Sequence, residues 1–212
     1  MVLLGRPSGS WRRNRRQNHC ERVASGPLLK GAYHNAKRVL ISCTTVCGMA
    51  VGLSEQQRQQ LVATFDERPA LLVGFVDASG DPFATRGWGV TFDANASHGR
   101  VVVPTADLRH AGLDDTNLGD RRIALNYVDI GSLRCVQLKG SFLSIEASTQ
   151  ADVEVYTTFR NRFFSAANEV DLLSTELLER LEPDEVATCT FSVDVAFDQT
   201  PGPGAGRPYG EP

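Results

Sequence analysis

The sequence has little that would mark a secreted or membrane-spanning protein. Its five cysteines are an odd number, and Cys20, Cys43 and Cys47 all lie before residue 48, so they do not form the framework of a disulfide-rich domain. No apolar run approaches the roughly 20 residues that a membrane-spanning helix needs. The run from Val39 to Cys47 is interrupted by hydroxyl residues and lacks the continuous apolar centre of a signal peptide. The sequence therefore predicts a cytoplasmic protein that does not act at a membrane.

Familiar catalytic and metal-binding motifs are also missing. There is no P-loop, no Gly-x-Ser-x-Gly and no His-Glu-x-x-His. The four histidines do not cluster with carboxylates, and Cys43 and Cys47 have no matching pair downstream that would complete a zinc site. The Gly-rich run 202–206 follows the last predicted strand and precedes no helix, so it is no dinucleotide loop. We expect no metal and identify no nucleophile with an adjacent base.

Charge is distributed unevenly along the chain. Residues 1–48 carry nine Lys and Arg against one acidic residue, whereas the remaining residues carry 13 Lys and Arg against 24 Asp and Glu. Such asymmetry is typical of a basic tail attached to an acidic domain. An acidic domain argues against nucleic acid as the main partner.

We expect three segments: a basic extension over residues 1–50, a folded domain over 51–200 and a Pro/Gly-rich tail over 201–212. The basic extension could contact nucleic acid or an anionic membrane. We favour a disordered extension, or upstream sequence translated from an early start codon with Met49 as the natural start. The tail is expected to be extended and to contribute nothing to the core.

The middle segment is predicted to be mainly β. Apolar or alternating runs closed by turn residues predict strands at 70–76, 82–92, 99–103, 121–128, 133–146 and 188–197. A capping box at Ser54 and Gln57 begins a helix with Leu61, Val62 and Phe65 on one face, which ends near Glu67. Apolar periodicity predicts further helices at 106–118, 151–167 and 171–181. This pattern predicts a mainly β or α+β fold around a small antiparallel barrel, rather than a parallel βαβ sheet.

The long strand at 133–146 changes face along its length. Its apolar positions are even at Val136 and Leu138 but odd at Leu143 and Ile145. A one-residue change of face next to a glycine is what a β-bulge produces, and we place the bulge at Gly140.

Three basic residues suggest a site for an anion. Arg86 lies within a predicted strand, and Arg109 and His110 follow the next strand. An arginine inside a barrel strand must pair with another group or reach solvent, and cations near a Gly-rich segment can hold a phosphate. The alternative is that Arg86 is a strand-edge cation and His110 a solvated loop residue.

The order of these motifs resembles the FMN-binding split barrel of the pyridoxamine 5′-phosphate oxidase-like superfamily. The resemblance covers about residues 54–200 and implies a split β-barrel of six or so antiparallel strands with flanking helices. It is carried by five short motifs: Ala84-Thr85-Arg86-Gly87-Trp88, Val103-Pro104-Thr105, Arg109-His110, Ile123-Ala124-Leu125-Asn126-Tyr127, and Arg134-Cys135-Val136 leading to Gly140.

The resemblance implies a homodimer with one FMN in each of two grooves at the subunit interface, and oxidoreduction of a small molecule. Arg86, Arg109 and His110 would hold the phosphate. Gly87 and Gly89 would let the cofactor approach the strand, and Trp88 would either pack on the flavin or fill the core. The other expected cofactor contacts are Val90, Thr91, Val103, Pro104, Thr105, Cys135 and Gln137.

Two residues depart from the family pattern. His110 stands where a lysine is usual, which would make phosphate binding partly pH-dependent. Cys135 stands where many members carry a glutamine that hydrogen-bonds the flavin ring, and a thiol is a poor donor. Gln137 lies on the same face of the strand and could take over that role. The choice between FMN and the deazaflavin F420 therefore stays open.

The resemblance leaves several functions open besides an FMN-dependent oxidoreductase. The C-terminal substrate segment of true pyridoxamine 5′-phosphate oxidase is missing, which argues against that enzyme. A tail closing over the partner's flavin, with Arg207 or Tyr209 as contacts, is one hypothesis for residues 201–212. A non-catalytic flavin- or haem-binding carrier or sensor is an alternative, and a cofactor-free dimeric protein on a decayed barrel is another. The substrate and the electron donor cannot be read from these residues.

Overall fold

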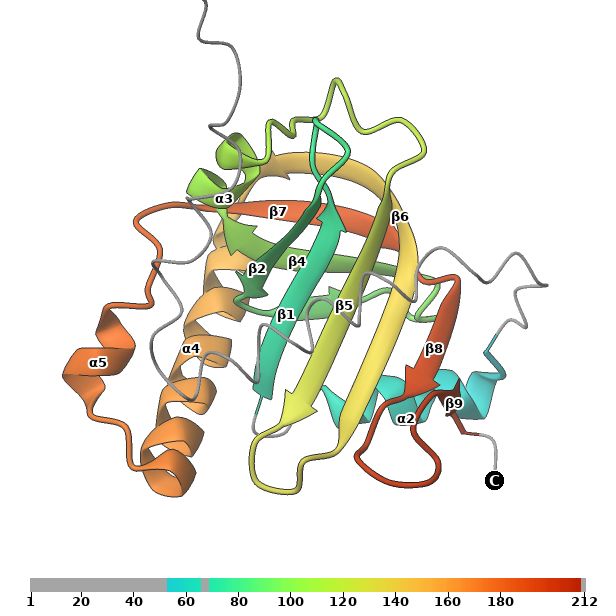
Figure 1. Cartoon of the computed structure of the whole chain (residues 1–212), viewed down its shortest axis with the longest axis vertical. Helices are drawn as coiled ribbons and strands as arrows, with labels where there is room; N and C mark the ends of the chain where they lie inside the picture. The colour runs from blue at the N-terminus through green and yellow to red at the C-terminus, as the bar shows by residue number, and fades with distance from the viewer. Residues whose placement is uncertain (1–52, 66–68, 211–212) are drawn as a thin grey trace, which may run out of the picture. The chain divides into compact units, whose positions relative to one another are not determined.

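The computed structural model describes residues 53–65 and 69–210 (Figure 1). The predicted basic extension lies outside these described residues, and the division of the chain into three segments stays a prediction. Within the described residues, no helix is both long and apolar enough to cross a membrane.

One antiparallel sheet of nine strands forms the framework. Its path runs β2-β1-β5-β6-β7-β4-β3, with β8 paired to β6 and β9 paired to β8. The strands are β1 (Pro69–Val76), β2 (Pro82–Gly87), β3 (Val90–Phe92), β4 (His98–Pro104), β5 (Arg122–Asp129), β6 (Cys135–Ala147), β7 (Val186–Ser192), β8 (Val195–Asp198) and β9 (Arg207–Pro208).

The sheet curls into a barrel around β6. Figure 1 shows β2, β1 and β5 side by side, with β7 and β4 crossing behind them and the curved β6 shared by both halves. The Trp88 amide donates to the Val102 carbonyl (2.8 Å), which joins the end of β2 to β4. The predicted mainly β, α+β split barrel with flanking helices is therefore confirmed.

Two of the expected strands are divided in the structure. The run 82–92 splits into β2 and β3 at Gly89, whose φ of +135° favours glycine. The run 188–197 splits into β7 and β8, because the Asp194 amide turns to the Lys139 carbonyl (2.9 Å) of β6. Both divisions occur where the chain passes from one half of the barrel to the other.

The bulge in β6 is real, but its predicted position is wrong. The register against β7 shifts between Phe142 and Ser144, so the extra residue is Leu143, which is 50% exposed. Gly140 has a different role, because a Cβ there would lie 1.6 Å from the Ser192 carbonyl oxygen. The glycine lets the two chain segments cross, and the parity change of β6 occurs after it.

Within residues 53–65 and 69–210, four helices flank the barrel: α2 (Glu55–Thr64), α3 (Thr105–His110), α4 (Gln150–Asp171) and α5 (Thr175–Glu179). The capping box of Ser54 and Gln57 is present at the start of α2. The helices α3 and α5 are shorter than predicted. Gly112 (φ +64°) follows α3, and Leu172 (φ +55°) ends α4 in a left-handed conformation, so a new helix must restart after Ser174.

Apolar side chains fill the barrel. Inward residues of β1, β5 and β6 and the α2 residues Leu61 and Phe65 belong to one buried cluster. Val62 of α2 is 39% exposed, so it does not share the buried face that was predicted for it.

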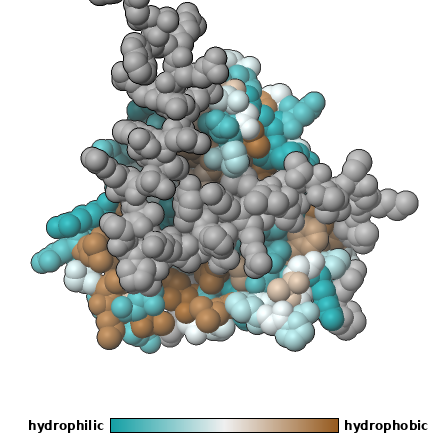
Figure 2. Space-filling model, in the orientation of Figure 1, coloured by the Kyte–Doolittle hydropathy of each residue, from teal (hydrophilic) through white to brown (hydrophobic). Residues whose placement is uncertain are grey.

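A hydrophobic area is exposed on the surface of the molecule where Figure 1 places α4 and α5 (Figure 2). The large exposed apolar residues around the junction of these helices are Val170, Leu172, Leu177 and Leu181.

The tail does contribute to the core, contrary to the prediction. Its strand β9 pairs with β8, and Tyr209 is only 8% exposed. The Tyr209 hydroxyl lies 3.1 Å from the Thr64 Oγ1, and Gln57 Nε2 donates to the Tyr209 carbonyl (2.8 Å). The end of the described chain thus holds α2 against the barrel.

Candidate functional site

A row of polar side chains crosses the outer face of the sheet. Arg86 of β2 is opposite Leu72 of β1, Leu72 is opposite Asn126 of β5, and Asn126 is opposite Gln137 of β6. Directly opposed residues of antiparallel strands point to the same face. Their sequence neighbours, such as Leu71 and Leu125, point into the barrel core. Arg86, Asn126 and Gln137 therefore share one surface of the sheet.

Arg86 lies at one end of this row. Its guanidinium carbon is 4.6 Å from the centre of the Phe163 ring of α4 and 5.8 Å from the Trp88 ring. Burial lowers the pKa of the Arg86 guanidinium. Among the described residues no carboxylate pairs with it, so its positive charge is balanced only by the faces of two rings.

Gln137 and Cys135 lie at the other end. Gln137 is 2% exposed, and its Oε1 accepts no hydrogen bond from the described residues. The Cys135 thiol donates to Asn126 Oδ1 (3.4 Å). Burial raises the pKa of Cys135 to about 11, against the opposing effect of the Asn126 contact, so the thiol stays protonated at neutral pH. Gln137 thus carries the unused acceptor, whereas the thiol is already engaged.

Trp88 and its flanking glycines pack into their own chain. Trp88 is fully buried against Tyr156 and Phe163, with ring centres 5.6 and 6.2 Å away, and its Nε1 has no acceptor among the described residues. A Cβ at Gly87 would lie 2.5 Å from the Leu71 side chain, and one at Gly89 would lie 2.7 Å from Val155. The space that these glycines leave is filled by protein side chains, and Trp88 fills the core.

The second basic group lies apart from Arg86. Arg109 Nη2 donates to Glu185 Oε2 (2.8 Å) on the surface, and the His110 ring is 5.8 Å from that of Phe83. Both residues lie in the last turn of α3, which is attached to β2 by a hydrogen bond from Thr85 to Asp107. Because Thr85 points to the opposite side of β2 from Arg86, one chain does not bring the three basic residues together.

The expected contacts at the end of β4 and the start of α3 differ in burial. Val103 is fully buried, whereas Pro104 and Thr105 are half-buried. The Thr105 Oγ1 is buried without a hydrogen-bond partner among the described residues. Only Thr105 of these three therefore has an unused polar group.

A pocket of about 410 Å³ lies between α4, β3 and the start of β1. It includes the predicted residues Gly89, Val90 and Thr91. The other lining residues were not predicted as site residues: Phe65 and Pro69, and from α4 Ala151, Glu154, Val155, Thr158, Phe159 and Arg162. Their three- and four-residue spacing on α4 was visible in the sequence, but only the fold shows what that face opposes.

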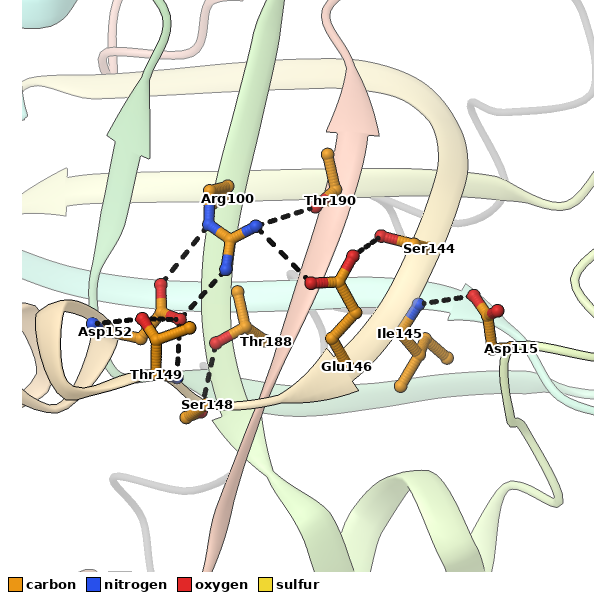
Figure 3. A network of polar contacts seen from close by, with 10 residues as sticks. All are labelled: Arg100, Asp115, Ser144, Ile145, Glu146, Ser148, Thr149, Asp152, Thr188 and Thr190. Atoms are coloured by element: carbon orange, nitrogen blue, oxygen red, sulfur yellow. Dashed lines mark hydrogen bonds and ion pairs between the residues drawn. The ribbon is translucent and has the colours of Figure 1, made fainter.

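A polar network anchors α4 to the sheet (Figure 3). Arg100 of β4 donates to both carboxylate oxygens of Asp152, at 3.3 and 2.9 Å, and to Thr190 at 3.4 Å. Asp152 also accepts from the amide and hydroxyl of Thr149, at 2.8 and 2.7 Å, and completes a capping box. Glu146 lies 3.7 Å from Arg100. This network is structural, and the Thr-x-x-Asp spacing was its only trace in the sequence.

No family model and no curated protein matches the chain. Solved structures do match it. HupZ from Group A Streptococcus is 16% identical, with 73% of this chain and 100% of that chain covered and a TM-score of 0.40. A protein described as F420 reductase is 12% identical, with coverages of 63% and 93% and a TM-score of 0.38.

A third match is a pyridoxamine 5′-phosphate oxidase-related, FMN-binding protein from Nostoc punctiforme. It is 9% identical, with 85% of this chain and 88% of that chain covered and a TM-score of 0.33. The fold itself follows from the strand pairing described above. The name of this third structure is that of the family which the sequence motifs resemble.

Proposed function

We propose that this chain binds FMN, with the phosphate at Arg86 and the ring near Gln137, and acts as an FMN-dependent oxidoreductase on a small molecule. The observation that carries the proposal is the half-buried guanidinium of Arg86, which has no carboxylate partner among the described residues. A cation withdrawn from water without a counter-charge is costly, and an arginine fork matches a dianionic phosphate.

The polar row has a suitable length for such a ligand. Arg86 and Gln137 are three strand positions apart, which corresponds to roughly 14 Å at the usual spacing between strands. A molecule with an anionic group at one end and a hydrogen-bonding ring at the other fits this arrangement. The unused Gln137 Oε1 would accept from a ring N–H, while the protonated Cys135 remains bound to Asn126.

The proposed site includes a second copy of the chain. The helix α3, which carries Thr105, Arg109 and His110, is attached to β2 through Thr85, which points away from Arg86, so we do not expect these residues to reach the same ligand within one chain. In a homodimer with the cofactor at the interface, these residues would come from the partner. When bound, FMN supplies the electron-accepting ring, and the chain's own residues bind the phosphate, orient the ring and limit access of water.

The test is a titration of the full chain with FMN, followed by visible absorbance and flavin fluorescence. We expect binding that Arg86→Ala weakens by at least tenfold and that Arg180→Ala, which removes an exposed arginine at the C-cap of α5, leaves unchanged. Equal binding by both variants would refute the phosphate assignment. Gel filtration of the loaded protein then tests the homodimer.

Two further measurements separate the alternatives. Competition between FMN and F420 determines the cofactor, because both carry a phosphate and a hydrogen-bonding ring. Repeated reoxidation of a reduced nicotinamide would support an enzyme, whereas binding without turnover would support a carrier or sensor. This distinction matters because the described residues of the candidate site include no nucleophile paired with a base.

A further inference from the structure

The pocket beside α4 has the features of a small-molecule site separate from the polar row. Its volume of about 410 Å³ lies within the usual range for ligand pockets. Phe159 and Val155 of α4 line one side, and Phe65 and Val90 add apolar surface. Apolar walls with a few polar groups are typical of sites for small organic molecules.

The two charged side chains of the pocket differ in whether they already interact with the rest of the chain. Glu154 and Arg162 both lie on α4, eight residues and therefore roughly 12 Å apart along the helix. Arg162 is already engaged in an interaction within the chain. Glu154 has no ion-pair or hydrogen-bond partner among the described residues, so it is the charged group of the pocket that is available to a ligand. Outside its first 48 residues the chain carries 24 acidic against 13 basic side chains, which favours the approach of cations.

We propose that this pocket binds a small apolar molecule that carries a protonated amine. The apolar body packs against Phe159 and Val155, and the ammonium group lies near the Glu154 carboxylate. The Phe159 ring adds an attraction for the cation where its face is accessible. The ligand binds to a single chain and does not require the cofactor, so this proposal stands independently of FMN binding.

Three probes of similar size test the charge preference: 2-phenylethylamine, 2-phenylethanol and phenylacetate. Binding to the full chain without added cofactor is measured by ligand-observed NMR and calorimetry at neutral pH. We expect the amine to bind best and phenylacetate to bind worst. Glu154→Gln should weaken amine binding about two- to fivefold, as expected for a partly exposed ion pair, and leave the alcohol unchanged.

Two variants control for location. Thr158→Trp places a large ring in the pocket and should abolish binding of all three probes, whereas Glu176→Gln on α5 removes one negative charge elsewhere and should change nothing. Circular dichroism checks that each variant folds. If Thr158→Trp fails to fold, the isosteric Glu154→Gln still tests the proposal. The proposal is overturned if the amine has no advantage over phenylacetate, or if Glu154→Gln and Glu176→Gln behave alike. The FMN titration of the same variants is a separate readout, so either proposal can fail without the other.

Discussion

Asp152 neutralises Arg100 with the same carboxylate that caps its own helix. The two oxygens lie 3.3 and 2.9 Å from Arg100 nitrogens, and one of them also accepts from the amide of Thr149 at 2.8 Å. One side chain thus determines both where α4 begins and where it sits on the sheet. The pocket and the ring that contacts Arg86 both depend on α4, so this ion pair positions both proposed sites.

Replacing Asp152 should destabilise the fold. Asp152→Asn keeps the shape but removes the charge opposite Arg100 and weakens the cap, so we expect a loss of about 1–3 kcal/mol in the free energy of unfolding. Urea denaturation measures it. Asp171→Asn, at the exposed end of the same helix, is the matched control and should stay within about 0.5 kcal/mol of the wild type. Equal stability of both variants would contradict the role of the ion pair.

The same residue predicts a pH dependence. Burial alone would raise the pKa of Asp152, but hydrogen bonds from Arg100 and Thr149 outweigh it and lower the pKa to about 2. Because the folded value is below the unfolded value of about 3.9, the stabilisation is fully present above pH 4 and is lost as the pH falls towards 2. Thermal melts of the wild type between pH 5 and 2.5 should show this loss, and melts of Asp152→Asn should show a smaller one.

The tail contact predicts a structural effect of Tyr209. Tyr209→Phe removes the hydrogen bond to Thr64 and should cost about 1 kcal/mol, while Tyr209→Ala also empties a buried site and should cost about 3 kcal/mol or more. Deletion of residues 201–212 should therefore loosen α2 and increase proteolysis there, even without cofactor. Unchanged melting of Tyr209→Ala would show that the contact is dispensable.

Arg86 should favour binding at the expense of stability. Arg86→Met keeps an apolar stem against Phe163 but removes a charge that no described carboxylate balances, so the unliganded variant should be as stable as the wild type or up to about 1 kcal/mol more stable. It should nevertheless lose FMN binding. Denaturation and FMN titration of one preparation test both statements. A destabilised Arg86→Met would indicate that the ring contacts of the cation outweigh its desolvation.

The two described cysteines should react slowly. Burial raises the pKa of Cys135 to about 11 and that of Cys189 to about 12, so little thiolate forms at pH 8. We expect iodoacetamide to label both at least tenfold more slowly in the folded protein than in urea, as measured by peptide mass spectrometry. Labelling of Cys135 at the rate of the unfolded chain would show that its side of the row opens to solvent.

Local signals predicted much of the fold. The capping box at Ser54 and the alternation around Phe191 depend on neighbouring residues, and both elements are present, although the predicted strand 188–197 is divided into β7 and β8. The position of the bulge depends on how β6 meets β7, a contact between distant segments, so the parity change alone led to Gly140 instead of Leu143. Tyr209 was missed for the same reason, since its partner lies 145 residues away.

The candidate site was predicted less completely. Arg86 and Gln137 were identified, and their common face follows from strand register. The sequence could not show that Arg109 is paired with Glu185 or that Gly87 and Gly89 make room for Leu71 and Val155. These are long-range packing relations that have no local pattern. The assignment of all thirteen residues to a cofactor stays a prediction.

The sharing of β6 has a consequence for how the protein opens. This strand pairs with β5 along one edge and with β7 and β8 along the other, so the same thirteen residues form the border strand of both halves of the barrel. Neither half can detach without exposing the backbone of the other. The strands β5, β6 and β7 should therefore open as a single cooperative unit, in which no strand opens before the others, and their amides should exchange at one common rate.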